Sequence, residues 1–444
     1  MPGKRELGEP GDSANMPLGG VDAALVCAKV RRRLIPFLFL LYIVAYIDRI
    51  NVGFAALQMN AALGFSASTF GFGAGIFFLS YITFEIPSNV ILSRVGARVW
   101  IARIMLSWGI ISSATMFVRS AGGFYLARFL LGAAEAGFFP GIIFYLTHWF
   151  PARERARAIA MLMTASLIAG VVGGPISGAL LTLDGVGGLA GWQWLFLLEG
   201  LPAIVLGFVV LGVLDERPDD AAWLSAEERD TLRMSLSNDA RTRSDRELPV
   251  SDVLKSPAVW LLAIVYFTIP VATYGLGFWL PQIIKAASGG SNTQVGLITT
   301  IPYVVGAIGM VIVGRHSDRT GERRWHVAVS AFVGGVAFAL SAFVHGLVPA
   351  LVLLSLAILG VASMFGPFWT LATARVSGVG AAVGIALINS VGNSGGFVGP
   401  YLLGYIKDAT QSFAIGFIFI GAILVCGAGL VLRTGQVRIT GCDQ

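Results

Sequence analysis

The stretch SRVGAR at residues 93–98 returns in altered form as DRTGER at residues 318–323. Three positions agree, each 225 residues after its match: Arg94 with Arg319, Gly96 with Gly321 and Arg98 with Arg323. The dipeptide Gly174-Pro175 recurs at the same offset as Gly399-Pro400. Glycine and proline are common in this chain, but four anchors in a single register indicate two related halves.

The chain around these anchors is strongly apolar. Hydrophobic residues make up 56% of the 444 positions and charged residues 13%, which is less charge than a soluble domain uses to cover its surface. Segments of about 20 apolar residues, long enough to cross a hydrocarbon core of about 30 Å, recur along the sequence. We predict twelve transmembrane helices, at roughly 34–58, 69–93, 98–118, 122–146, 156–180, 193–214, 258–285, 294–314, 325–345, 348–370, 380–404 and 411–432.

A charged segment at residues 215–257 separates six predicted spans from the other six. Because six is an even number, both halves enter the membrane in the same direction, so the repeat is parallel about an axis normal to the membrane. The expected fold is an all-α membrane protein whose twelve transmembrane helices form two six-helix bundles. The expected division is a tail at 1–33, a bundle at 34–214, a linker at 215–257, a bundle at 258–432 and a tail at 433–444. A capping box of Ser225 with Glu228 predicts a short helix within the linker.

The charges are distributed unevenly between the two sides of the predicted membrane. Twenty-six lysines and arginines lie in the tails and loops of one side, against Arg119, Lys285 and Lys407 on the other. This bias predicts a multi-pass protein of the bacterial inner membrane with both termini in the cytoplasm, and it makes nucleic acid an unnecessary explanation for the net charge of +6. Residues 1–33 lack the apolar core of a signal peptide, so we expect a disordered tail.

Six candidate charged residues lie inside the predicted spans of the first half, namely Asp48, Arg49, Glu85, Arg128, Glu135 and Glu199, whereas the second half has no Asp, Glu, Lys or Arg well inside its spans. An ionised group at the bilayer centre costs at least about 2.5–3.5 kcal/mol, so each is expected to have a partner and usually a function. At the repeat offset, Asp48 and Arg49 correspond to Thr273 and Tyr274. One half therefore handles charge, and the other offers neutral hydrogen-bonding groups.

The spacing of these residues restricts their partners. Arg128 and Glu135 share one helix face with Gly132 between them, whereas the adjacent Asp48 and Arg49 point about 100° apart. We predict that the acids pair with the arginines between the spans 34–58 and 122–146. An arginine is then released for a substrate carboxylate when its acid is protonated, because a guanidinium binds carboxylates bidentately and keeps its proton. For Glu85 and Glu199 we expect structural pairing with loop arginines.

The repeated loop resembles the signature of the major facilitator superfamily, G-x-L-a-D-R-x-G-R-K, and the resemblance covers nearly the whole chain. The second copy keeps Gly314, Asp318, Arg319, Gly321 and Arg323, whereas the first has Asn89 and Ser93 in place of the Gly and the Asp. In the family this loop pairs charges at the cytoplasmic gate. The resemblance therefore implies gate roles for Asp318, Arg319, Arg94 and Arg98, with the pairing doubtful where Ser93 stands.

Five further strings resemble the anion:cation symporter family within that superfamily: AYIDRINVGFA, YITFEIPSN, RFLLGAAEAGFFPG, GWQWLFLLEGLPA and INSVGNSGGFVGPYLLG. This resemblance implies proton-driven uptake of a carboxylate. By motif position it implies proton coupling at Asp48 and Glu135, substrate contact by Arg49 and Tyr81, and Arg128 at the same site, paired with the acid. It also implies an asparagine, Asn389 or Asn393, that closes the site. Trp369 is a weaker candidate wall, because membrane aromatics more often pack or anchor.

Other functions remain open at this stage. The string GVVGGPISG at 170–178 resembles the signature of drug/proton antiporters, although its twin Gly399-Pro400 favours a packing role. A membrane sensor would carry an output module, which no tail here is long enough to supply. We find no nucleophile elbow, phosphate loop or metal set, so we expect neither an enzyme nor a cofactor. We expect a functional monomer that binds a small organic anion, with tartrate-like hydroxy acids or aromatic acids as candidates. Protons are the expected coupling ion, with sodium not distinguished.

Overall fold

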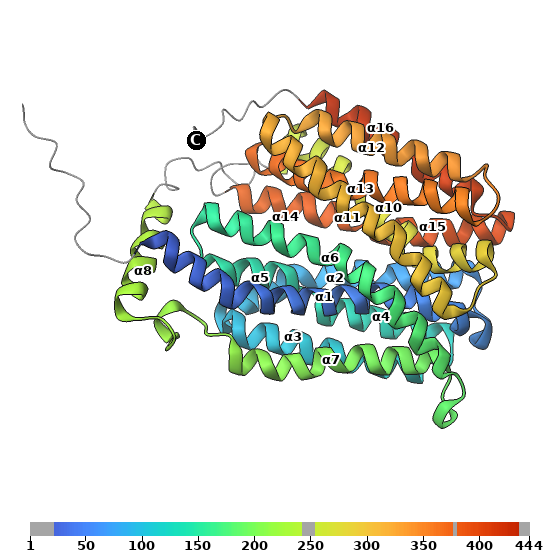
Figure 1. The fold of residues 1–444 in the computed structure, drawn as a ribbon, viewed down its shortest axis with the longest axis horizontal. Coiled ribbons are helices and arrows are strands. Elements are labelled where there is room, and N and C mark those ends of the chain that lie inside the picture. Colours follow the sequence, from blue (N-terminus) through green and yellow to red (C-terminus); the bar gives the residue numbers. More distant parts are fainter. Residues whose placement is uncertain (1–21, 242–253, 376–379, 435–444) are drawn as a thin grey trace, which may run out of the picture.

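The computed structural model describes residues 22–241, 254–375 and 380–434, and the regular structure in these ranges is entirely helical (Figure 1). Eleven helices of the described chain are long and apolar enough to cross a membrane. The one remaining predicted span, the eleventh in chain order, consists of two helices, α14 (Gly380–Asn393) and α15 (Gly395–Thr410). They join through Ser394, which has helical backbone angles of φ −61° and ψ −23°. The prediction of an all-α membrane protein with twelve spans is confirmed.

The first bundle contains α1 (Ala23–Leu63), α2 (Ala67–Val95), α3 (Ala97–Ala114), α4 (Ala121–Glu135), α5 (Phe138–Thr147), α6 (Ala152–Leu180) and α7 (Gly191–Val213). Serines begin two of these helices, since the Ser66 hydroxyl accepts from Thr69 N and the Ser120 hydroxyl from Gly123 N. Such side chains satisfy backbone donors that the first turn leaves free. The predicted disordered tail at 1–33 is wrong from residue 23 onward, because α1 already begins there.

The predicted span 122–146 is broken in the structure, which is a second departure from the sequence expectation. Helix α4 ends at Glu135 and α5 begins at Phe138, with Gly137 at φ 88° between them. Only glycine enters this left-handed region easily. The Ser88 hydroxyl donates to the carbonyl of Ala136 at 2.6 Å, which satisfies a backbone acceptor freed by the break. The break places the Glu135 carboxyl at a helix end inside the bundle.

The second bundle contains α10 (Pro257–Ser288), α11 (Asn292–Thr320), α12 (Arg324–Ser341), α13 (Leu347–Arg375), α14, α15 and α16 (Ala414–Arg433). The linker helix α8 (Ala226–Arg241) begins at the predicted capping box, with Glu228 N donating to Ser225 Oγ at 3.2 Å. Lys29 of α1 donates to the Glu228 carboxylate at 2.7 Å, and this bond lowers the pKa of the Glu228 carboxyl. We call the side of the molecule on which α8 lies the linker side (Figure 1).

The two bundles meet tightly on the opposite side, where α2 packs on α15 and α6 packs on α11. Glycines make this approach possible: a Cβ added to Gly174 would lie 2.7 Å from the carbonyl oxygen of Gly296. Gly71, the repeat position of Gly296, makes a similar contact with the Pro400 backbone, one residue after the repeat position of Gly174. The carboxylate of Asp408 adds a polar contact, because it accepts from the backbone nitrogens of Ala67 and Ser68 at 3.0 and 2.7 Å. The opposite side is therefore closed in this structure.

We predict that Gly174→Leu shifts the protein away from this closed arrangement. Overpacking of a tight contact costs about 1–3 kcal/mol, which corresponds to a population change of roughly 5–150-fold. The measurement is the labelling rate of Thr273→Cys, in a cysteine-free background, by a membrane-impermeant thiol reagent added to each side in turn. Labelling from the opposite side should rise.

Gly212→Leu is the matched control, because a Cβ at Gly212 meets no atom within 4 Å. If labelling in Gly174→Leu equals that of this control, the glycine contact does not hold the opposite side closed.

Candidate functional site

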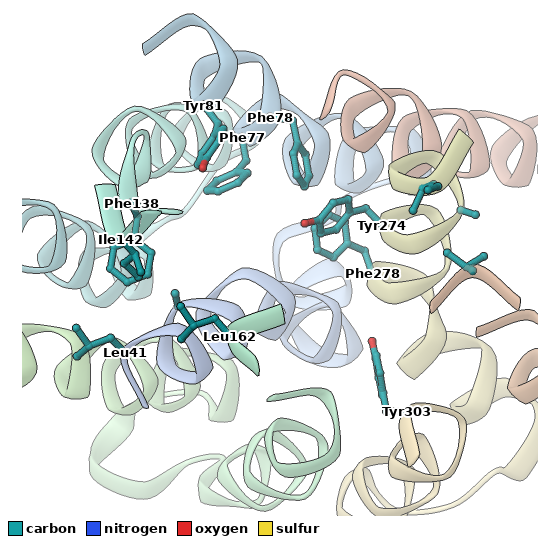
Figure 2. Close-up of a cluster of buried hydrophobic side chains, with 14 of the residues drawn as sticks. Leu41, Phe77, Phe78, Tyr81, Phe138, Ile142, Leu162, Tyr274, Phe278 and Tyr303 are labelled. Atoms are coloured by element: carbon teal, nitrogen blue, oxygen red, sulfur yellow. The ribbon is translucent and has the colours of Figure 1, made fainter. Parts of the chain in front are cut away.

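A cavity of about 1230 Å³, counting space continuous with solvent, lies between the two bundles. Its walls come from both halves, including α1, α2, α10, α11, α13 and α14. Figure 2 shows Tyr81, Tyr274 and Tyr303 on three different helices, directed toward the interior between the bundles. Twelve of the 27 described lining residues are aromatic: Tyr42, Tyr46, Phe78, Tyr81, Phe138, Phe139, Tyr266, Tyr274, Tyr303, Phe338, Phe365 and Trp369.

Arg49 is the only charged residue among the described residues that line this cavity. Its Nη2 forms an ion pair with Glu135 Oε1, and its Nη1 donates to the Tyr274 hydroxyl at 3.0 Å. Its Cζ lies 5.3 Å from the ring centroid of Phe77 and 5.5 Å from that of Tyr81. Aromatic faces attract a cation at such distances, so the guanidinium is held in place while part of it faces the cavity.

The bond from Arg49 to Tyr274 joins equivalent positions of the two halves, since the residues are 225 positions apart. The repeat axis therefore passes through the cavity at this pair. In the same way, a Cβ at Gly53 would lie 2.8 Å from the carbonyl of its equivalent, Phe278. The charged half supplies the arginine and the neutral half supplies a phenol, which is the division that the sequence predicted.

Glu135 is buried, with 1% of its surface exposed, and its Oε2 makes no hydrogen bond. The end of α4 positions this carboxyl at the negative end of a helix dipole, where an ionised acid is disfavoured unless a cation compensates it. Arg49 is that cation. The predicted pairing of an acid with an arginine between the first and fourth spans is present for these two residues.

Arg128 was predicted to share the site, but it lies behind Phe77 and is not among the residues that line the cavity. Its Cζ is 5.0 Å from the Phe77 ring, and its only hydrogen bond here is a long one, from Nη2 to the Ala74 carbonyl at 3.4 Å. Its Nε and Nη1 are buried without hydrogen-bond partners. Phe77 therefore lies between two guanidinium groups, and only Arg49 reaches the cavity.

Asp48 faces α3 rather than an arginine, which differs from the predicted ion pairing. Its carboxylate accepts from Trp108 Nε1 at 2.6 Å, from the Ser112 hydroxyl and from Asn51 Nδ2 at 3.3 Å. Neither the tryptophan nor the serine was identified from the sequence. They are ordinary residues of an apolar helix, and only the fold brings them to the acid.

Glu85 and Glu199 correct a second expectation, because neither pairs with a loop arginine. Glu85 accepts from Asn389 Nδ2 of the other bundle at 3.0 Å, and Glu199 accepts from the Ser177 hydroxyl at 2.7 Å. Asn389, Asn393 and Trp369 all line the cavity, as do Arg49 and Tyr81. The predicted substrate contacts other than Arg128 are therefore brought together, and Glu85 already occupies the Asn389 amide.

Two of the loop residues predicted at a gate, Asp318 and Arg98, are each bound within their own half. Asp318 forms an ion pair with Arg323 at 2.6 Å. In the first half, where Ser93 replaces the acid, Glu216 of the linker accepts from the backbone nitrogens of Ala97 and Arg98 at 2.7 and 2.9 Å. Arg94 and Arg319 lie in the last turns of α2 and α11. The missing carboxylate of the first copy is thus supplied from the linker.

Several lining residues were missed by the sequence reasoning, including Tyr42, Tyr46 and Tyr303. Tyrosines in apolar helices carry no distinctive spacing, so no local signal identified them. Tyr274 had one available signal, because it stands at the repeat position of Arg49.

A family model described as Major Facilitator Superfamily matches residues 38–400. A protein of Agrobacterium vitis named "Putative tartrate transporter" is 48% identical over 92% of this chain and 91% of its own length. A protein of Acinetobacter baumannii named "Quinolone resistance transporter" is 42% identical over 90% of this chain and 93% of its own length.

Among solved structures, a bacterial homologue of the human lysosomal transporter Spinster superposes with a TM-score of 0.74 at 18% identity. The match covers 91% of this chain and 96% of that one. At this identity the likeness concerns the fold alone.

We predict that Arg49→Ala and Glu135→Gln are coupled in their effect on stability. Removing one member of a buried ion pair costs about 3–5 kcal/mol, because the other charge is left uncompensated. Arg49→Ala should therefore lower the melting temperature of the purified protein sharply, and adding Glu135→Gln should restore much of the loss. The melting temperatures of both single variants and the double variant are the measurement; strictly additive losses would show that the two side chains do not interact.

Proposed function

The chain belongs to the Major Facilitator Superfamily, and from this we propose that it is a transporter that takes up a small organic carboxylate together with protons. Transporters of this architecture bind their substrate between the halves near the middle of the membrane and alternate which side is open. The cavity between the bundles has that position. No enzyme activity enters the proposal.

The charge of the cavity carries the proposal. Among the described lining residues the single charged group is a cation, Arg49. A guanidinium suits a carboxylate because its planar donors match two oxygens at once. A cavity built for an organic cation would instead present an acid, and here the nearest acid, Glu135, is already paired with that arginine.

The coupling to protons follows from the same pair. While Glu135 is ionised, it occupies one edge of the Arg49 guanidinium. A proton on Glu135 removes that competition, so an incoming carboxylate meets an arginine with free donors. Proton and anion then favour each other's binding, which is a reciprocal linkage. We assign proton coupling to Glu135 and Asp48 and substrate contact to Arg49, Tyr81, Asn393, Asn389 and Trp369, with Arg128 holding Phe77 and Arg49 in position from behind.

The proposed setting is the bacterial inner membrane, with the linker side in the cytoplasm, because the lysines and arginines gather there. In that orientation the structure is closed toward the outside, at the contacts of Gly174 with Gly296 and of Ser68 with Asp408. The transport unit in this proposal is a single chain, since the cavity lies within one chain.

The anion class is a hydroxy acid such as tartrate or an aromatic acid. The name of the Agrobacterium vitis relative supports the first. The tyrosine hydroxyls and the two asparagines offer hydrogen bonds that a hydroxy acid needs, while the rings of Phe78 and Trp369 suit an aromatic acid.

A drug antiporter is the second candidate, and the name of the Acinetobacter baumannii relative supports it. The glycine-rich stretch 170–178 was the sequence argument for this function. In the structure Gly174 and Gly178 pack on the α11 backbone, and a Cβ at Gly178 would lie 2.7 Å from the Asn292 carbonyl. Packing explains the stretch, so the uptake proposal is the stronger one.

We predict that Glu135→Gln retains exchange of substrate across proteoliposome membranes but loses uphill accumulation driven by a pH gradient. Glutamine keeps the shape of the side chain and carries no exchangeable acid proton. Glu227→Gln, on the exposed face of α8, is the control and should accumulate substrate normally. Accumulation by Glu135→Gln at the wild-type level would refute the assignment of the proton carrier.

We also predict that carboxylates raise the melting temperature of the purified protein, and that they do so more strongly at lower pH. The experiment is a thermal-shift screen of organic acids and lipophilic cations at two pH values, with Arg49→Ala as the binding-deficient comparison. Arg49→Ala should lose the carboxylate effect. Stabilisation by lipophilic cations alone would support the antiporter instead.

A further inference from the structure

Glu199 of α7 is a buried carboxyl that the proposed mechanism does not use. Only 5% of its surface is exposed. Its Oε1 accepts a hydrogen bond from Ser177 of α6 at 2.7 Å, and its Oε2 is buried without a partner. An unpaired buried carboxylate oxygen is costly, because the lost hydration is not replaced.

No cation compensates Glu199. The groups that act on it from the helices packed around it are Ser177 from α6 and Asn51 and Asp48 from α1. From α3, Ser113 reaches the neighbouring Gly200 and carries no charge. Asp48 is the one titratable group among them, and it is also an acid. Two ionised carboxylates would repel each other in this interior.

Asp48 and Glu199 have different numbers of hydrogen-bond donors, and this difference favours a different protonation state for each carboxyl. Asp48 receives hydrogen bonds from Trp108, Ser112 and Asn51, an arrangement that stabilises the ionised form. Glu199 has the single hydrogen-bond donor Ser177, and the Asn51 side chain is among the groups that act on it. Asn51, which is fully buried, therefore lies beside both an acid with three hydrogen-bond donors, Asp48, and an acid with one, Glu199.

We propose that Asp48, Asn51 and Glu199 form a second proton-binding site, separate from the Arg49–Glu135 pair, which holds its proton on Glu199 in this conformation. A proton removes the uncompensated charge in one step. The described residues contain no group of three or more His, Cys, Asp or Glu side chains that could hold a metal ion. The existence of this proton-binding site does not depend on which anion is transported. Only its role in coupling rests on the proposed function.

The proton-binding site lies close to the helix contact that closes the opposite side. Ser177 lies between Gly174 and Gly178, the residues through which α6 packs on α11. The hydrogen bond from Ser177 to Glu199 therefore lies on α6 beside the surface that moves when α6 and α11 separate. Glu199 is therefore placed to exchange its proton when the opposite side opens, whereas Glu135 exchanges at the cavity.

The first test is infrared spectroscopy of the purified, substrate-free protein in sodium-free buffer near neutral pH. A protonated carboxyl has a C=O stretching band that an ionised carboxylate lacks. We expect Glu199→Gln to remove one such band, and Glu135→Gln and the surface control Glu227→Gln to keep it. Absence of any band that depends on Glu199 would overturn the proposal.

Two further infrared measurements test the hydrogen bond to Glu199 and the binding of sodium in place of the proton. Ser177→Ala should shift the frequency of the same band, because Glu199 loses its hydrogen bond; an unshifted band contradicts the assignment, and this arm serves if Glu199→Gln does not fold. Addition of sodium chloride at constant pH should leave the band unchanged. Loss of the band on adding sodium would show that the site takes sodium in place of the proton.

The second test addresses coupling. One coupled proton is worth about tenfold in accumulation for each pH unit of gradient. With a gradient of one pH unit, Glu199→Gln proteoliposomes should accumulate the anion about tenfold less than wild type, and wild-type accumulation would overturn the role in coupling. The infrared test contains no substrate, so its failure concerns this site alone, whereas a failed carboxylate screen concerns the proposed function alone.

Discussion

The excess of buried acid over buried base in the first bundle is the constraint on which the rest of the site depends. Four acids, Asp48, Glu85, Glu135 and Glu199, are buried there, together with the two arginines Arg49 and Arg128. The second bundle has no buried Asp, Glu, Lys or Arg among its described residues. A membrane interior tolerates little uncompensated charge, so the bundle approaches neutrality only when it carries protons. In the proposed mechanism, charge balance rather than any single contact links proton binding to an anionic substrate.

The internal repeat determines where the charged and neutral residues of the two halves meet. Arg49 and Tyr274 occupy equivalent positions and meet at the axis between the bundles. The tight glycine contacts also come in a nearly equivalent pair, since Gly296 follows Gly71 by 225 residues and Pro400 stands one residue after Gly399, the repeat position of Gly174. A parallel duplication brings equivalent helices face to face, so a change of residue in one half alone creates asymmetry at the axis. In this protein the first half contributes a cation, Arg49, and the second half contributes the neutral phenol and amide groups.

The sequence predicted the parts of this arrangement that depend on spacing and on the repeat. Arg49 and Glu135 were identified because charge is rare in apolar spans, and Asn389 and Asn393 because of a family motif. The break after Glu135 was not predicted, since Ala136-Gly137 looks like any small-residue step in a membrane helix. The partners of Asp48, Glu85 and Glu199 were predicted wrongly or left open, because serine, tryptophan and asparagine become partners only through tertiary packing. The capping of α3 by Glu216 was missed for the same reason.

The two acid sites differ in the kind of partner that each carboxyl has, and this difference separates their tasks. Glu135 is paired with a cation that also faces the cavity, so its proton and the substrate carboxylate act on the same guanidinium. Asp48 and Glu199 interact with neutral donors behind α1, where a substrate does not reach. In the proposed mechanism, a proton at the first site changes the affinity for the anion directly. A proton at the second can change it only by altering which side of the protein is open, because no shared ligand connects Glu199 to the cavity. The proposed coupling through a shared arginine and the proposed coupling through conformation are therefore physically distinct, and each is assigned its own carboxyl.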